Sequence, residues 1–291
     1  MKNSLENLLP KIVLAPTTVA MVVCMYGFMI WTAGLSMTKS RMLPQWDFTG
    51  FSQYGRLFAN PRWDVALNNL WVFGFLFIAI ALVLGLLLAI FLDQKIRGES
   101  VIRTIYLYPM AISFIVTGTA WKWVLNPGLG LEKLVQDLGF TGFEFRWLVD
   151  PEMAIYTIVI AAVWQSSGFV MAMFLAGLRG IDDSLIKAAQ IDGASPIRTY
   201  WHVILPILRP AFFSAIVILA HIAIKSFDLV QALTGGGPGY SSDLPANFMY
   251  TFAFNRAEMG LGAASSMIML FGVLAILVPY LYSELRGQKN G

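Results

Sequence analysis

Charged residues are scarce in this sequence: of 291 residues only 13% are Asp, Glu, Lys or Arg, whereas 57% are hydrophobic. Four long stretches contain no charged residue at all; they are Ile12–Thr38, Val65–Leu92, Met153–Leu178 and Met259–Ser283. A helix of about 20 apolar residues crosses the hydrocarbon of a bilayer. The composition therefore excludes an ordinary water-soluble domain and predicts a membrane protein.

Two further apolar stretches are interrupted by charge. Thr104–Leu125 contains Lys122, and Ile207–Ala232 contains Lys225 and Asp228 in addition to Arg209 at its cytoplasmic start. Ionisable side chains inside a span are costly and are functional candidates by default. With these two stretches the sequence predicts an all-α polytopic membrane protein of six transmembrane helices. Lys225 and Asp228 are three residues apart, so they are expected on one face of the fifth helix, where they can form an ion pair.

The residues that usually carry chemistry are also few. The single cysteine, Cys24, lies inside the first apolar stretch and cannot form an internal disulfide, and two histidines are too few for a histidine metal cluster. No Gly-x-x-x-x-Gly-Lys-Ser/Thr motif occurs, so the chain has no phosphate-binding P-loop. Asp182 and Asp183 are interpreted as the start of a helix. The sequence therefore predicts that this chain is not an enzyme and holds no cofactor or metal of its own.

The distribution of Lys and Arg predicts the orientation, because short cytoplasmic loops are richer in these residues. With both termini inside, eleven cations lie in the cytosol and seven outside. The cytosolic set is Lys2, Lys11, Lys95, Arg97, Arg103, Arg179, Lys187, Arg198, Arg209, Arg286 and Lys289. The outside set is Lys39, Arg41, Arg56, Arg62, Lys133, Arg146 and Arg256. This anchoring accounts for the net charge of +3, and no nucleic-acid partner is expected.

The most patterned polar segment is Ile181–Pro206, on the predicted cytoplasmic side. Asp182 can cap a first short helix, Gly193 can end it in a left-handed conformation, and Ser195-Pro196 can start a second helix that runs to Pro206. An amphipathic helix needs a surface on which to bury its apolar face. Interfacial helices on the headgroups, packing against this chain's own helix ends, and docking to a separate cytosolic protein are alternatives that the residues alone leave open.

The core of that segment reads Lys-Ala-Ala-Gln-Ile-Asp-Gly-Ala and resembles the signature loop of permeases from binding-protein-dependent ABC importers. In that family the loop forms a coupling helix that sits in a cleft of the ATPase subunit. The resemblance implies that coupling residues here are Leu185, Lys187, Ala188, Ala189, Asp192, Gly193 and Ala194. One departure is Lys187, where the family usually has Glu, so the salt bridge of that Glu is not carried over.

The resemblance covers nearly the whole chain. Asn68-Asn69-Leu70, Tyr106–Pro109 and Leu233–Pro238 are similar to carbohydrate permeases of the maltose-transporter type, and two regions resemble the glucose and mannose subgroup. The family fold implied is that of type I ABC importer permeases. The substrate-binding residues implied by this likeness are Asn126, Leu129, Gly130, Lys225 and Ser226, and Asp228 is added because it shares a face with Lys225. Trp164 and Gln165 are weaker candidates.

The expected organisation follows. Residues 1–64 hold a tail, the first transmembrane helix and an external loop; residues 65–283 hold the permease core, with the coupling loop at 179–206; residues 284–291 form a cytoplasmic tail. The implied partners are a second homologous permease, two ATPase subunits that bind ATP and Mg, an external solute-binding protein, a sugar and the lipid bilayer. The implied location is the bacterial cytoplasmic (inner) membrane, with both termini in the cytoplasm.

Other functions stay open at this point. An ion-coupled secondary transporter would use Lys225 and Asp228 as a titrating pair, although such proteins commonly contain internal repeats and this chain has no convincing one. An importer of another sugar or a polyol fits the same resemblance. A membrane scaffold without transport activity would explain the amphipathic loop but not polar groups inside the fifth helix.

Overall fold

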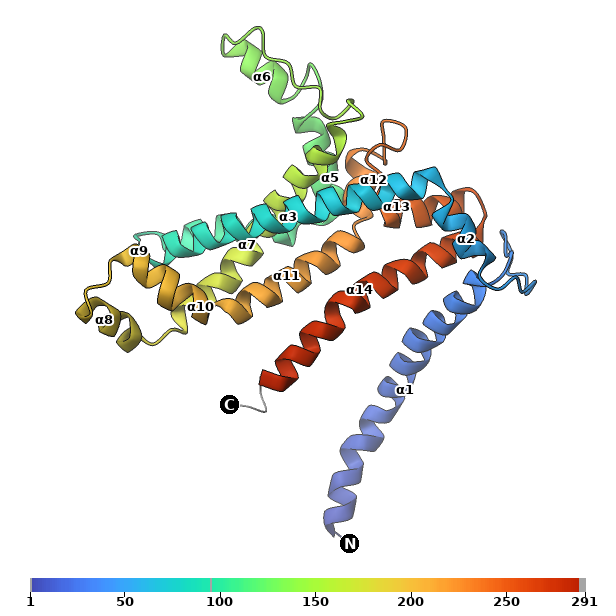
Figure 1. Ribbon diagram of the computed structural model, residues 1–291, viewed down its shortest axis with the longest axis horizontal. Coiled ribbons are helices and arrows are strands. Elements are labelled where there is room, and N and C mark those ends of the chain that lie inside the picture. Colours follow the sequence, from blue (N-terminus) through green and yellow to red (C-terminus); the bar gives the residue numbers. More distant parts are fainter. Residues whose placement is uncertain (1, 95, 288–291) are drawn as a thin grey trace. The chain divides into compact units, whose positions relative to one another are not determined.

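The computed structural model describes residues 2–94 and 96–287 and is built almost entirely from helices (Figure 1). Among these residues, extended pairing is limited to an isolated bridge between Thr38 and Phe48. Lys95 and Lys289, used to predict the orientation, and residues 288–291 of the predicted tail lie outside the described residues. The chain divides into unit 1, Met1–Asn60 with Phe248–Leu270, and unit 2, Pro61–Asn247 with Phe271–Gly291.

Unit 1 contains the N-terminal helix and the start of the C-terminal one. Its elements are α1 (Lys2–Ser36), α2 (Ser52–Phe58) and a π-helical turn η3 (Thr251–Asn255). Two helices cross the boundary between the units, α13 (Pro245–Tyr250) and α14 (Met259–Gly287).

Unit 2 holds the remaining elements. They are α3 (Pro61–Asp93), α4 (Glu99–Leu107), the 3₁₀ turn η1 (Tyr108–Ala111), α5 (Phe114–Val124), α6 (Leu131–Asp137), α7 (Ala154–Arg179), α8 (Asp183–Ile191), α9 (Pro196–Thr199), the π-helical turn η2 (Tyr200–Ile204), α10 (Leu205–Ile207), α11 (Arg209–Ile224) and α12 (Asp228–Leu233).

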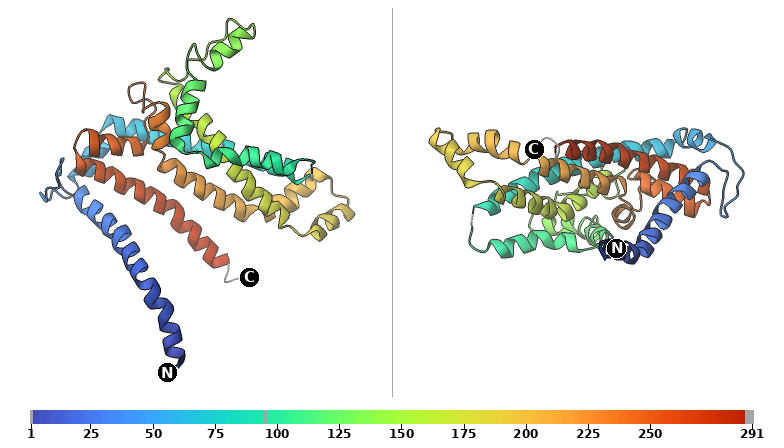
Figure 2. Two further views of the ribbon diagram at one scale, coloured as in Figure 1. Left: turned by 180° about the vertical axis from the view of Figure 1, so that it is seen from behind. Right: turned by 90° about the horizontal axis from the view of Figure 1, so that it is seen from below.

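The core of unit 2 is formed by α3, α7 and α11, which run side by side (Figures 1 and 2). A Cβ on Gly85 of α3 would overlap Val170 of α7, and the last residues of both helices meet where Arg179 faces Asp93, so α3 and α7 are parallel. Gly177 near the end of α7 faces Leu208 at the start of α11, which therefore runs back in the opposite direction. Small residues at these contacts allow the helices to approach closely.

Four helices are long and apolar enough to cross a membrane: Val13–Ser36, Pro61–Asp93, Ala154–Arg179 and Met259–Tyr282. They correspond to the four charge-free stretches of the sequence. The number rises to six if each of two bent helix pairs is one span. The prediction of an all-α polytopic protein is confirmed, but the two charge-interrupted spans are not continuous helices.

The predicted span Thr104–Leu125 is broken. Its two parts, Glu99–Ala111 and Phe114–Val124, meet at 102°. Pro109 lies in the 3₁₀ turn, and the Ser113 hydroxyl then caps α5 by accepting from the amide of Val116. Because proline has no amide hydrogen and fixes φ, it favours such a helix end. The Ile112 carbonyl freed at the bend accepts a hydrogen bond of 2.7 Å from the Gln165 side chain of α7.

The predicted span Ile207–Ala232 is broken as well. Helix α11 ends at Ile224 and α12 begins at Asp228, so Lys225 and Asp228 do not share one continuous helix face. Their charged groups do not form an ion pair within 4 Å either, so the expectation of a Lys225–Asp228 ion pair on one helix face is wrong. The physical reason is tertiary: α12 packs against α5 at Gly118, where a Cβ would lie 2.7 Å from Ala232.

Candidate functional site

The polar loop after α7 begins with a capped helix. Asp182, in an extended conformation, accepts a 2.8 Å hydrogen bond from the amide of Ser184 at the start of α8. This bond to the charged form lowers the pKa of the Asp182 carboxyl from its ordinary value. The cap read from the sequence is confirmed, and it satisfies one of the free amides that every helix start leaves.

The elbow of the loop lies at Gly193, whose φ of +75° is left-handed. The amide of Gly193 donates to the Gln190 carbonyl at 3.0 Å, and the amide of Ala194 donates to the Ala189 carbonyl at 2.9 Å. A Cβ at Gly193 would meet nothing within 4 Å. Glycine is therefore required here by the backbone conformation and not by lack of space.

The second helix of the loop starts as predicted and ends differently. Ser195 accepts from the amide of Arg198, and Pro196 occupies the first turn of α9. The expected end at Pro206 is off by one residue, because α9 continues through η2 and α10 to Ile207. The π-helical turn just before Pro206 accommodates a residue that lacks an amide donor, and the chain then bends by 63° into α11.

Large apolar side chains of this loop are exposed. The loop surface, as we call it, consists of Leu185 (48% exposed), Ile191 (85%), Ile197 (72%) and Trp201 (67%). Helix α8 has no buried residue, whereas Ile186 and Tyr200 pack partly against the core of unit 2. Of the seven implied coupling residues, Ala189 and Ala194 are half-buried and the other five exposed. Ile191 and Ile197 are not among the coupling residues implied by the family resemblance, although apolar residues in a polar loop signal such a surface.

The loop begins beside the end of α3 that carries Asp93. Arg179, the last residue of α7, donates to Glu99 at 2.8 Å and lies 4.0 Å from Asp93. The opposite end of α3 holds the loop after α12: Arg62 contacts Asp243 at 2.6 Å, and the Asn69 amide donates to the Ser241 and Asp243 carbonyls. At 1.5 Å per residue the 33 residues of α3 separate these ends by about 50 Å.

The break between α11 and α12 lies between those two ends. Ala223 of α11 faces Gly74 of α3, where a Cβ would lie 3.9 Å away. Gly74 is 13 residues from Pro61 and 19 residues from Asp93. The break is therefore about 20 Å along α3 from its start and about 28 Å from its end. Such a position is at membrane depth if α3 crosses the bilayer.

Charged and polar residues occupy this break. Lys225 and Asp228 are exposed on unit 2, whereas Ser226 is buried. A broken helix leaves backbone carbonyls and amides without helical partners, and in membranes such backbone is tolerated where it is buried in protein or lines a water-filled path. The amides of Lys225 and Ser226 already donate to the His221 and Ala223 carbonyls. The groups that the break leaves exposed are therefore the side chains of Lys225 and Asp228.

The other implied substrate residues lie between α5 and α6. Asn126 is half-buried and its carbonyl accepts from the Gly130 amide at 3.0 Å, while Leu129 is 75% exposed. A Cβ on Gly130 would overlap the carbonyl oxygens of Trp123 and Val124, so this glycine has a role in the turn itself. No hydrogen bond or ion pair within the described residues joins Asn126 to Lys225, Ser226 or Asp228. Packing of α5 on α12 is what connects the two groups.

Three residues of α7 contact the bend between α4 and α5. Gln165 is 4% exposed and its amide nitrogen holds the Ile112 carbonyl, whereas its oxygen is buried without a partner. A Cβ on Gly168 would overlap the Tyr106 carbonyl, so only glycine permits this approach. The neighbouring Trp164 meets Trp121 edge-on at 5.9 Å. These contacts give Gln165 and Trp164 a structural role in the bend.

The Arg62–Asp243 pair was not expected from the sequence. Asp243 is 1% exposed, and burial raises the pKa of its carboxyl while the Arg62 hydrogen bond opposes the rise. One carboxylate oxygen has no hydrogen-bond donor and lies so close to Gly236 that a Cβ on this glycine would overlap it. Over the described parts of the chain, no group of three or more His, Cys, Asp or Glu side chains could hold a metal ion.

Comparison with known proteins shows the relationships of the chain. The family described as binding-protein-dependent transport system inner membrane component matches residues 81–286. A probable ABC transporter permease protein of Pyrococcus horikoshii is 38% identical over 97% of this chain and 98% of that protein. The xylose/arabinose import permease protein of Haloferax volcanii is 36% identical over 91% of this chain and 84% of that protein.

Among solved structures, a chain of a bacterial ABC transporter involved in the import of the acidic polysaccharide alginate has the same fold. Its TM-score is 0.81, with 21% identity over 99% of this chain and 98% of that one. The fold is therefore that of an ABC importer permease. The chain belongs to the binding-protein-dependent transport system inner membrane components, the permease subunits of ABC transporters.

Proposed function

We propose that this chain is one of two related permease subunits in an ATP-driven importer of a monosaccharide such as glucose or mannose. Two copies of a separate ATPase subunit would bind ATP and Mg, and an external solute-binding protein would deliver the sugar. Both termini would lie in the cytoplasm. The observation that carries the proposal is the exposed apolar loop surface at one end of the unit 2 bundle.

The loop surface favours docking to a partner over packing against the chain itself, and the family of the chain favours docking over helices that lie on the headgroups. Ile186 and Tyr200 already pack against the core of this chain, whereas Leu185 and Ile191 stay exposed to solvent. Exposed apolar side chains gathered on two short helices typically mark an interaction site. We therefore assign the helix α8, the Gly193 elbow and α9 to the cleft of the ATPase subunit.

The break between α11 and α12 supports a substrate path. A charge at the centre of a span costs at least about 2.5 to 3.5 kcal/mol in lipid. Because Lys225 and Asp228 are exposed on unit 2 at this depth, their face is better suited to the second permease or to a water-filled path than to hydrocarbon. Sugar hydroxyls require such donors and acceptors when they leave water. We place Lys225, Ser226 and Asp228 at the sugar path, with Asn126, Leu129 and Gly130 as its second group.

The proposed mechanism connects the two sites. Closure of the ATPase dimer on ATP would draw the docked loops together and convert the permeases from an inward-facing to an outward-facing state. The bundle of α3, α7 and α11 would transmit this motion over about 28 Å to the break. Sugar released by the solute-binding protein would then enter the path between the two permeases.

The identity of the sugar is open to competing assignments. The likeness to the glucose and mannose subgroup motivates the first choice, and the relative named as a xylose/arabinose permease favours a pentose as the second. Importers of other sugars or polyols share the same loop. Ligand identification by mass spectrometry on the solute-binding protein purified from its native host would decide between them.

Uptake into proteoliposomes tests the proposal as a whole. We expect radiolabelled sugar to accumulate only when ATP is inside with the ATPase subunits and binding protein is outside. Uptake that requires an ion gradient and no ATP would instead support a carrier with Lys225 and Asp228 as its titrating groups. Absence of uptake by the complete complex across hexoses, pentoses and polyols would support a scaffold.

Variants at the break test the proposed path. Because Lys225 and Asp228 are not paired, Lys225→Met and Asp228→Leu should each reduce uptake, and the double variant should show additive loss with assembly preserved. Asn126→Ala should weaken uptake with the complex intact. Lys122→Met is the matched control, since it removes an exposed lysine from α5 outside the break. Normal uptake in both single variants would remove the break from the path.

A further inference from the structure

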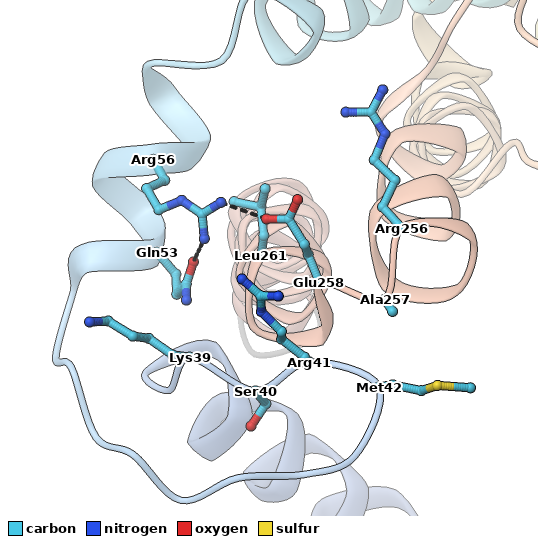
Figure 3. Close-up of a pocket in the computed structure, with 10 residues that line it drawn as sticks. All are labelled: Lys39, Ser40, Arg41, Met42, Gln53, Arg56, Arg256, Ala257, Glu258 and Leu261. Carbon is cyan, nitrogen blue, oxygen red and sulfur yellow. Dashed lines mark hydrogen bonds and ion pairs between the residues drawn. The ribbon is translucent and has the colours of Figure 1, made fainter.

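Unit 1 contains a pocket of about 400 Å³ with an excess of positive charge (Figure 3). Its cationic residues come from three separate segments: Lys39 and Arg41 from the loop after α1, Arg56 from α2, and Arg256 from the turn before α14. A single carboxylate, Glu258, lines the same pocket. The formal charge of these five side chains is therefore +3.

The walls of the pocket are ordered by hydrogen bonds. The Ser40 hydroxyl donates to the Gln45 carbonyl at 2.7 Å and accepts from the Gln45 amide at 3.1 Å. The Gly260 amide of α14 donates to the Ser40 carbonyl at 2.9 Å, and the Gln53 side chain of α2 donates to the Thr38 carbonyl at 2.8 Å. These bonds fix the backbones of the segments that carry the cations before any ligand is bound. Arg41 and Arg56 point toward Glu258, whereas Lys39 and Arg256 point away from it at the edges of the pocket (Figure 3).

Only part of the positive charge is balanced within the chain. Arg56 forms an ion pair with Glu258, shown by a dashed line in Figure 3. Lys39, Arg41 and Arg256 have no carboxylate within 4 Å among the described residues. Like charges gathered in one pocket repel, so a bound anion would stabilise the arrangement.

The pocket lies at the level where two candidate spans end. The span Val13–Ser36 ends three residues before Lys39, and the span Met259–Tyr282 begins immediately after Glu258. Three exposed aromatic side chains belong to the same loop: Trp46 (60% exposed), Phe48 (72%) and Phe51 (71%). Trp46 also meets Trp31 of α1 edge-on at 5.0 Å. Such aromatic residues are enriched at the boundary between headgroups and hydrocarbon.

We infer that this pocket binds the phosphate of an anionic phospholipid headgroup. Guanidinium groups match phosphate oxygens with paired donors, and lysine adds a point charge. The aromatic loop beside the pocket suits the glycerol and upper acyl region of the same lipid. An acidic surface of a protein would satisfy the cations but would leave the exposed ring surfaces of Trp46, Phe48 and Phe51 in water, which is why the lipid is favoured.

The test counts lipids retained by the intact transporter complex. The purified complex is titrated with dioleoylphosphatidylglycerol, and bound lipid is counted by native mass spectrometry. Lys39→Gln and Arg41→Gln should each weaken retention about fivefold, and the double variant about 25-fold, since each cation near a membrane surface contributes roughly this factor. The control is Lys133→Gln with Arg146→Gln, which removes the same charge from unit 2 and should leave retention unchanged.

Further arms separate the sources of the anion. Zwitterionic dioleoylphosphatidylcholine should be retained poorly, and an excess of inorganic phosphate should not displace the lipid. Glu258→Gln should increase retention, because it removes the carboxylate that competes for Arg56; this variant keeps the test valid if the double variant assembles poorly. Equal retention in the wild type, the double variant and Glu258→Gln would overturn the inference, as would displacement by phosphate. Lost association with the solute-binding protein at unchanged lipid retention would identify a protein docking surface instead.

Discussion

Two polar segments of unit 2 are specified in different ways. The loop 182–204 is organised by its own neighbours in sequence: Asp182 caps α8, Gly193 forms the elbow and Ser195 caps α9. The segment 225–247 is organised by distant residues, with Gly118 of α5 receiving α12, and Arg62 and Asn69 of α3 holding the loop that follows. The first segment has an exposed apolar surface, and the second packs against α3 and α5 of the bundle.

The difference has a consequence for how each segment depends on the rest of the chain. A loop built from local caps keeps its shape on any bundle, so it can present the same surface to an ATPase subunit. A broken helix held by tertiary contacts changes whenever its packing partners change. In this account coupling depends on local signals, and the proposed sugar path depends on long-range packing.

The largest effect is expected from Arg62→Met. It would leave the Asp243 carboxylate, which is 1% exposed, without its cation, and removing one partner of a buried pair typically costs about 3 to 5 kcal/mol. The lost stability is measured as a lower melting temperature of the purified complex, with protease cleavage of the loop 234–247 as the readout of unfolding. Lys133→Met is the control, because its pair with Asp137 is exposed and worth under about 1 kcal/mol. Equal melting of both variants would contradict long-range control of this segment.

A smaller loss of stability is expected from Gly118→Ala. The new methyl group would lie 2.7 Å from Ala232 and 3.0 Å from the Leu229 carbonyl, and overpacking of this kind costs about 1 to 3 kcal/mol. The shift of α12 should also reduce sugar uptake. Gly27→Ala is the matched control on α1, where the added methyl meets nothing within 4 Å. If uptake and melting of the two variants are alike, α12 is not positioned by α5.

The sequence predicted the loop well because its signals are local. The caps at Asp182 and Ser195 and the left-handed Gly193 follow from residue type and position alone, and the structure has all three. The four charge-free spans were predicted for the same reason. The elbow, the caps and the apolar runs can each be recognised within a stretch of about 20 neighbouring residues.

The breaks in the other two spans could not be predicted in that way. Nothing between Ile224 and Asp228 interrupts a helix by itself, since no proline or glycine lies there. The interruption depends on the packing of α12 against Gly118, more than 100 residues away in sequence. The same holds for the Arg62–Asp243 pair and for Gln165 at the Ile112 carbonyl, which are contacts between distant segments. Whether the implied substrate residues bind sugar stays a prediction.

Changes at the elbow should affect coupling more than stability. Gly193→Val places a β-branched residue at φ +75°, a strain of roughly 1 to 2 kcal/mol that the loop can relieve by changing the direction of α9. We expect the complex to assemble but to lose stimulation of its ATPase activity by sugar-loaded binding protein. Gly193→Asn should retain most of the stimulation, because asparagine tolerates the left-handed region. Full stimulation in the valine variant would rule out the elbow role.

The smallest effect is expected at the cap and depends on pH. The pKa of Asp182 is lowered from 3.8 by the Ser184 amide, so the cap stabilises α8 above pH 3.8 and is lost as the pH falls through the lower folded value. Hydrogen exchange at Ser184 should be roughly several-fold faster in Asp182→Ala at pH 7, and Asp182→Asn should preserve protection. Protection that is the same in the alanine variant and the wild type would show that the cap does not hold α8.

Site-specific photo-crosslinking tests the central claim, docking of the loop surface on an ATPase subunit, most directly. A benzophenone amino acid replaces Ile191, which is 85% exposed on α8, in the purified and fully assembled complex. The control places it at Trp71, which is 78% exposed on the α3 span. The account predicts a covalent adduct with the ATPase subunit from position 191 and none from position 71. An adduct from position 191 with lipid or with this chain alone would contradict it.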